Sequence, residues 1–135
     1  MSTRKWKYPF VGRVNRNDSD CWCDALALAT GKSYDEIWAL FQPFLFESGS
    51  LESHFISGYL MLNGYERLMI STGDSVGDLF QVLDSRNNDI VIEIDDHVVY
   101  VSNNRIHDNV HVGNTSRYLC VTATGYYRRP KVKKQ

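Results

Sequence analysis

The sequence predicts an α+β fold, in which helices from the first half of the chain pack on a mostly antiparallel β-sheet from the second half. Apolar residues in residues 20–64 have near-helical spacing between capping residues and glycines. Residues 89–129 instead contain short β-branched and aromatic runs separated by a turn signal. The 135 residues contain no internal repeat and no linker rich in proline or glycine, so we expect a single domain spanning 1–135.

Local capping signals define the expected helices. The run CWCDALALAT follows three polar residues that can cap a helix, and it ends before Gly31. Ser33 and Glu36 have the spacing of a capping box, which opens a second helix over SYDEIWALF. A third helix is expected within residues 50–65, and a fourth, short one within 75–85.

The expected strands follow. DIVIEI (89–94) is β-branched and mostly apolar, which is typical of a buried strand. HVVYVS and RIHDNVHV form a hairpin, since Asn103 and Asn104 between them tolerate the positive φ of a two-residue turn. RYLCVTATGYYRR closes the sheet, and ERLMIS adds an edge strand.

Composition limits the function classes. The net charge is −1, and the basic residues concentrate in the two ends (about 1–8 and 128–135), which we expect to be flexible; a nucleic-acid partner is therefore not expected. No apolar stretch has the length of a membrane span, and the N-terminus lacks the apolar core of a secretory signal. We expect a cytoplasmic protein that has no membrane partner and whose three cysteines are reduced.

Two cysteines two residues apart raise the question of chemistry. Successive helical residues rotate by about 100°, so Cys21 and Cys23 point to different sides and suit neither one zinc ion nor one disulfide. We expect no metal and no cofactor. Cys23 and Cys120 lie in apolar runs, which predicts core positions. Cys21 lies in the first helical turn, where the dipole favours a thiolate, although three nearby aspartates oppose its ionisation; a small buried residue is the alternative.

A nucleophilic thiol needs a base, and the base needs a residue that orients it. With the turn at the two asparagines, His97 and Asp108 lie diagonally on one face of the hairpin, about 7–8 Å apart at the backbone. An aspartate at that distance can hydrogen-bond an imidazole and fix its tautomer. His107 and His111 point to the opposite face by the same alternation.

These residues carry a resemblance to a known family. The segments NDSDCWCDALALATGKSYDEI (17–37) and DHVVYVSNNRIHD (96–108) resemble the small papain-like, C39-like cysteine peptidase proteins found in bacteriophage and bacterial genomes. The resemblance covers about 35 residues in two blocks. It implies a minimal papain-like fold, with Cys21 as the nucleophile, His97 as the base and Asp108 as its orienting partner.

The implied reaction is acyl transfer, as in a thiol protease. Cys21 attacks a carbonyl carbon, and His97 takes the thiol proton and later protonates the leaving group. The backbone N–H of Cys21 and a side-chain amide of Asn17 or Asn15 would hold the oxyanion. The expected partner is a protein or peptide substrate, such as an extended tail or an isopeptide, and in a phage setting it could be a host protein in the host cytoplasm.

A second interpretation belongs to a different class. The chain could keep the papain-like fold and act without catalysis, as a binding protein or an inhibitor of a host factor. An occluded Cys21, a His97 turned away from it, or a large exposed aromatic patch would favour this interpretation.

Overall fold

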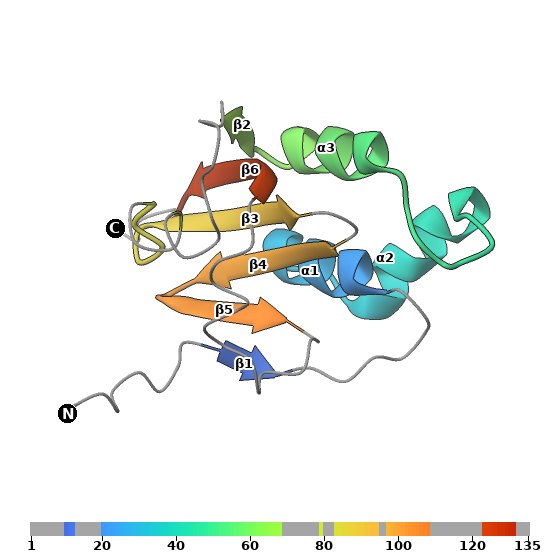
Figure 1. The fold of residues 1–135 in the computed structure, drawn as a ribbon, viewed down its shortest axis with the longest axis horizontal. Helices are drawn as coiled ribbons and strands as arrows, with labels where there is room; N and C mark the ends of the chain where they lie inside the picture. Colours follow the sequence, from blue (N-terminus) through green and yellow to red (C-terminus); the bar gives the residue numbers. More distant parts are fainter. Residues whose placement is uncertain are drawn as a thin grey trace.

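The structure, a computed structural model, describes residues 10–12, 20–68, 79, 83–94, 97–108 and 123–131 (Figure 1). The helices in this part of the chain are α1 (Cys21–Thr30), α2 (Tyr34–Phe41), the short 3₁₀ helix η2 (Gln42–Phe44) and α3 (Ser53–Leu62). The strands are β1 (Phe10–Gly12), β2 (Glu66–Leu68), β3 (Asn88–Ile94), β4 (His97–Ser102), β5 (Arg105–Asp108) and β6 (Ala123–Pro130).

The strands form one sheet in the order β1-β5-β4-β3-β6-β2. Every pair is antiparallel except β1 and β5, which are parallel. Helix α1 packs mainly on β4, and α3 contacts α1 and lies near β2, the strand at one edge of the sheet (Figure 1). The predicted α+β class, with N-terminal helices on a mostly antiparallel sheet, is confirmed. None of the described helices is long and apolar enough to cross a membrane.

The helix boundaries follow the capping signals. Gly31 ends α1 in the left-handed conformation, with φ 76°. Ser33 Oγ accepts a hydrogen bond from the Glu36 backbone N–H, and Glu36 Oε1 accepts one from the Ser33 backbone N–H, which completes the predicted capping box. Asp20 occupies the N-cap position of α1, but its side chain does not cap the helix. Its Oδ2 accepts a hydrogen bond of 2.8 Å from the Tyr34 hydroxyl instead.

The β4–β5 hairpin has the predicted register. Ser102 pairs with Arg105, and Asn103 and Asn104 form the turn with φ 52° and 65°. Ser85 anchors this turn, because its carbonyl oxygen accepts from the Asn103 N–H and its hydroxyl accepts from the Asn104 N–H, both at 2.8 Å. The turn is therefore attached to the segment that leads into β3.

The two faces of the sheet bury different clusters. One cluster joins the helices to the sheet and includes Trp22 and Leu26 of α1 with Val98, Tyr100 and Tyr127. The other cluster lies on the opposite face, and its sheet residues are mainly Ile90, Ile92, Ile94, Val99, Val101 and Ile106. The period of two along each strand therefore assigns every strand residue to the helix-covered face or to the opposite face.

The structure also differs from the sequence expectations. Strand β1 was not anticipated, and β6 continues through Pro130, into the segment 128–135 that the sequence assigns to a flexible basic end. Most of the expected fourth helix, 75–85, lies outside the described residues, as do Cys120 and His111.

Candidate functional site

Cys21 and Cys23 have different environments at the start of α1. Cys21 is the first residue of the helix and is half-buried, whereas Cys23 is fully buried. The Cys23 thiol donates to the carbonyl oxygen of Tyr34 at 3.4 Å, so its predicted core position is confirmed. Trp22 is also in the core, and its Nε1–H donates to the Gly49 carbonyl oxygen at 3.0 Å. Of these two cysteines, only Cys21 is partly exposed to solvent.

Two carboxylates flank Cys21. Asp20 has no exposed surface and Asp24 is 5% exposed, so both are buried in the first turn of α1. Negative charge at a helix N-terminus is favourable to the helix, because it interacts with the unpaired backbone N–H groups.

The ends of three elements lie together around Cys21. His97 is the first residue of β4 and Asp108 is the last residue of β5, and since the two strands are antiparallel, these positions lie at the same end of the sheet. Figure 1 shows that α1 also begins at this end, next to the start of β4. The structure therefore places the elements that carry Cys21, His97 and Asp108 at one end of the sheet. For Asp108 the description is limited to the backbone, which pairs with Gly12 of β1.

The alternation of side chains along β4 determines the face of the sheet to which His97 belongs. Val98 and Tyr100 face α1, so His97 falls on the opposite face with Val99. His107 pairs with Tyr100 and its ring lies 5.4 Å from the Tyr100 ring, so His107 is on the α1 face. The position of His107 on the α1 face agrees with the prediction, and the opposite face for His97 follows from strand alternation. A contact between His97 and Cys21 requires the imidazole to reach around the end of the sheet, where β4 begins.

The structure does not describe the two asparagines predicted for the oxyanion hole. Asn15 and Asn17 lie outside the described residues, and so their proposed part in an oxyanion hole stays a prediction. Within the described ranges, no group of three or more histidine, cysteine, aspartate or glutamate side chains could hold a metal ion.

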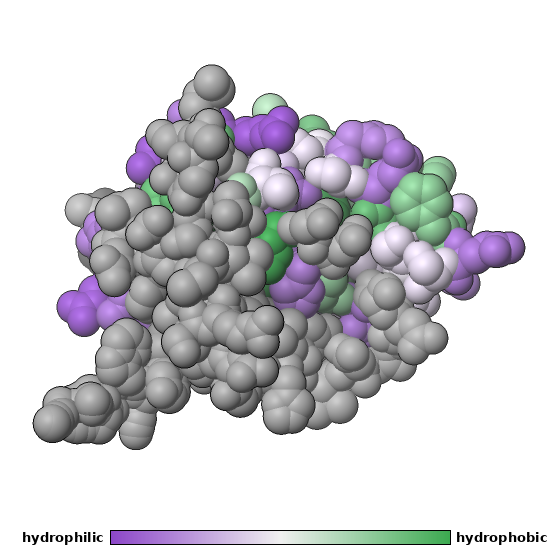
Figure 2. Space-filling view, in the orientation of Figure 1, coloured by the Kyte–Doolittle hydropathy of each residue, from purple (hydrophilic) through white to green (hydrophobic). Residues whose placement is uncertain are grey.

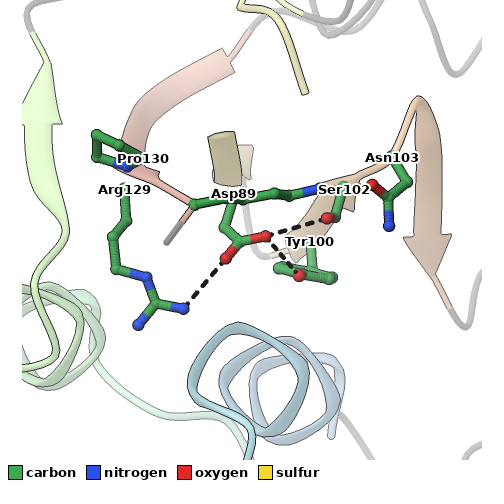
Figure 3. Close-up of a pocket in the computed structure, with 7 residues that line it drawn as sticks. Asp89, Tyr100, Ser102, Asn103, Arg129 and Pro130 are labelled. Atoms are coloured by element: carbon green, nitrogen blue, oxygen red, sulfur yellow. Dashed lines mark hydrogen bonds and ion pairs between the residues drawn. The ribbon is translucent and has the colours of Figure 1, made fainter. Parts of the chain in front are cut away.

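A polar pocket of about 580 Å³ lies near the C-terminal end of α1, at the opposite end of that helix from Cys21 (Figure 3). Its lining residues come from β3, from the end of β4 with its turn, and from the end of β6: Asp89, Tyr100, Ser102, Asn103, Arg129, Pro130 and Lys131.

Asp89 organises the inner part of this pocket. Its Oδ1 accepts hydrogen bonds of 3.0 Å from the hydroxyls of Tyr100 and Ser102, and its Oδ2 accepts one of 3.1 Å from Arg129 (Figure 3). Three donors and an opposite charge compensate the desolvation of this carboxylate.

Arg129 joins the pocket to two helices. One guanidinium nitrogen donates to the carbonyl oxygen of Asn63 at the end of α3, and the other donates to that of Ala29 near the end of α1, both at 3.0 Å. The guanidinium also lies over the Tyr65 ring, 4.6 Å from its centre. Helix C-termini carry partial negative charge, so the Arg129 cation is stabilising at the C-terminal ends of α1 and α3.

Burial holds the nearby tyrosines in their neutral form. Burial is the main cause that raises the pKa of Tyr100 to about 12, and the Asp89 charge acts in the same direction. Burial also raises the pKa of Tyr65, against the effect of Arg129, and the Tyr65 hydroxyl donates to Ala29 at 2.8 Å. Both hydroxyls therefore stay donors at neutral pH.

Glu93 is a buried carboxylate on the helix-covered face of the sheet. It accepts hydrogen bonds from the hydroxyls of Ser53 (2.8 Å) and Tyr127 (2.9 Å). Burial is the main cause that raises the pKa of Tyr127.

Asp89 and Glu93 were not predicted as site residues from the sequence. The available signal was their spacing of four in an otherwise apolar strand, which puts both on one face.

Comparisons of the chain with protein-family models, with curated proteins and with solved structures found no match.

Proposed function

We propose that this protein is a papain-like cysteine hydrolase that cleaves a peptide or isopeptide bond. The supporting observation is the position of Cys21. It is the exposed one of the two described cysteines, it opens a helix, and it lies at the end of the sheet where β4 begins with His97 and β5 ends with Asp108.

The proposed reaction has two steps. In the first, His97 takes the thiol proton, the sulfur bonds to the substrate carbonyl carbon, and the C–N bond breaks as His97 returns the proton to the amine. In the second, His97 activates a water molecule that hydrolyses the thioester and releases the acid. Asp108 orients the imidazole, and the N–H of Cys21, with an amide from Asn17 or Asn15, holds the oxyanion.

The orientation of His97 is the strictest requirement of this mechanism. By strand alternation its Cβ is directed away from α1, so the imidazole must fold over the strand end to reach Cys21.

The test is the rate at which iodoacetamide alkylates Cys21 as a function of pH, read by mass spectrometry. We expect alkylation well below pH 8 in the parent protein, because a nearby imidazolium stabilises the thiolate, and a shift of the midpoint by about one pH unit or more upwards in His97→Ala. His54→Ala is the matched control, since His54 is an exposed histidine on α3, and it should leave the curve unchanged.

An alkylation curve that is the same in the parent, His97→Ala and His54→Ala would contradict the hydrolase proposal. Cys23 serves as an internal reference in each sample, because its burial should keep it unmodified while the protein is folded.

A second candidate function, non-catalytic binding, is favoured by a different observation. The exposed large apolar side chains of the described residues lie between positions 40 and 62: Leu40, Phe44, Phe46, Met61 and Leu62. Residues 33–64 contain four acidic residues and no lysine or arginine. Figure 2 shows hydrophobic and hydrophilic residues side by side over this part of the surface. An apolar surface edged by acidic groups suits a basic, apolar segment of a partner protein. This function takes precedence if Cys21 reacts as an ordinary thiol.

A further inference from the structure

We propose that the polar pocket between β3, β4 and β6 binds a small anion that carries hydroxyl groups, of the sugar-phosphate type. This inference is independent of the proposed hydrolase function, since the pocket is at the C-terminal end of α1 and Cys21 is at the N-terminal end. Its volume of about 580 Å³ is in the range of small-molecule sites.

The charge of the pocket is positive by one unit. Asp89 and Arg129 form an ion pair at 3.1 Å and neutralise each other. Lys131 remains, and among the described residues it has no carboxylate partner; its Nζ donates to Asn103 Oδ1 at 2.6 Å. A cation would be repelled here, and an anion attracted.

The groups that would contact the anion are held in place. The Lys131 backbone N–H donates to the Asn87 carbonyl oxygen at 2.9 Å, which fixes the start of its side chain. Asn103 is fixed by the hydrogen bond of its backbone N–H to Ser85. Because the Asn103 side-chain oxygen accepts from Lys131, its NH₂ group can donate to a ligand, together with the remaining N–H bonds of the Lys131 ammonium. A phosphate or carboxylate oxygen is the natural acceptor for both.

The inner part of the pocket selects for hydroxyl groups. Ser102 and Tyr100 use their protons on Asp89, so their oxygens face a ligand as acceptors. A ligand hydroxyl can donate to the Ser102 oxygen while its phosphate contacts Lys131. An apolar ligand would cover the acceptor sites of these oxygens, which their hydrogen bonds to Asp89 leave open, without supplying a donor, which is costly.

The test is a ¹H–¹⁵N NMR titration of the whole chain with glycerol 3-phosphate and, separately, with methyl phosphate, at constant ionic strength and pH 7.5. We expect saturable shifts at the amides of residues 102–104, 129 and 131, and tighter binding of glycerol 3-phosphate, because methyl phosphate lacks hydroxyls. Loss of one charge-assisted hydrogen bond in Lys131→Gln should weaken binding roughly tenfold.

Lys32→Gln is the matched control, since it removes the same charge from an exposed lysine that does not line the pocket, and it should leave the affinity unchanged. Ser102→Ala should reduce the preference for glycerol 3-phosphate over methyl phosphate while both still bind. Shifts that do not saturate, equal losses in the two lysine variants, or an unchanged preference in Ser102→Ala would overturn the proposal. Amide spectra of each variant without ligand show whether the fold is retained.

Discussion

Arg128 and Arg129 are neighbours in β6 with opposite environments. The guanidinium of Arg129 binds Asp89 and two helix-end carbonyls, and it is about one-third exposed. Arg128 is exposed to a similar degree, but it forms a long pair of 3.7 Å with Glu66, whose side chain is largely exposed. An arginine with three acceptors should matter much more to stability than one in a long pair with an exposed partner, because its loss leaves Asp89 without a countercharge.

Replacing Arg129 therefore has a predictable cost. We expect Arg129→Met to lower the free energy of unfolding by about 2–3 kcal/mol, since it leaves a partly buried carboxylate and two carbonyls with fewer donors. Arg128→Met should change it by less than about 0.5 kcal/mol. Urea unfolding followed by circular dichroism measures both values. If the two variants lost the same free energy of unfolding, the contacts of Arg129 would contribute no more to stability than those of Arg128.

At the scale of the element, the predictable features were the local ones. The capping box at Ser33, the stop at Gly31 and the turn at Asn103-Asn104 depend on residues at most four apart, and all three are confirmed. Strand β1 was missed because it has only three residues and its partner β5 begins more than 90 positions later. A short run with a distant partner has no local pattern to reveal it.

The hairpin turn offers a direct test of the backbone conformation. Asn104 has φ 65°, in the left-handed region, and its side chain does not line the pocket. We expect Asn104→Gly to stabilise the protein by about 0.5 kcal/mol, because Asn-Gly is the preferred pair for this turn, and Asn104→Val to destabilise it by about 1–2 kcal/mol. Thermal unfolding of the two variants beside the parent gives the order, and a valine variant as stable as the glycine variant would rule out this turn geometry.

At the scale of the whole molecule, the candidate site could be predicted only in part from the sequence. The exposure of Cys21, the burial of Cys23 and the opposite faces of His97 and His107 follow from helical rotation and strand alternation. The carboxylate contacts were not predictable, because Asp89 and Glu93 are bound by residues 11 to 40 positions away. Such contacts exist only after β3 has paired with β4 and β6, and the Ser53–Glu93 contact also requires α3 to pack on the sheet.

Three buried tyrosines connect the helices, the strands and the buried carboxylates. Tyr65 donates to α1, while Tyr100 and Tyr127 donate to Asp89 and Glu93, and burial raises the pKa of all three. A hydroxyl whose pKa is higher in the folded than in the unfolded state contributes stability that is present below the unfolded value, near pH 10, and is lost as pH rises through the folded value. The unfolded chain binds fewer protons in this window, so stability must fall with pH there.

We therefore expect the free energy of unfolding in urea to fall steeply between pH 10 and pH 12, where Tyr100 titrates in the folded protein at about pH 12. Absorbance at 295 nm should show the matching delay in tyrosinate formation relative to the unfolded chain. Tyr100→Phe should be less stable than the parent at pH 8, because it loses a hydrogen bond to Asp89, and less sensitive to pH above 10, since one titrating group is gone. The comparison separates tyrosine from lysine ionisation, because the variant retains every lysine. If the free energy of unfolding fell equally steeply with pH in both proteins, ionisation of the Tyr100 hydroxyl would not be linked to folding.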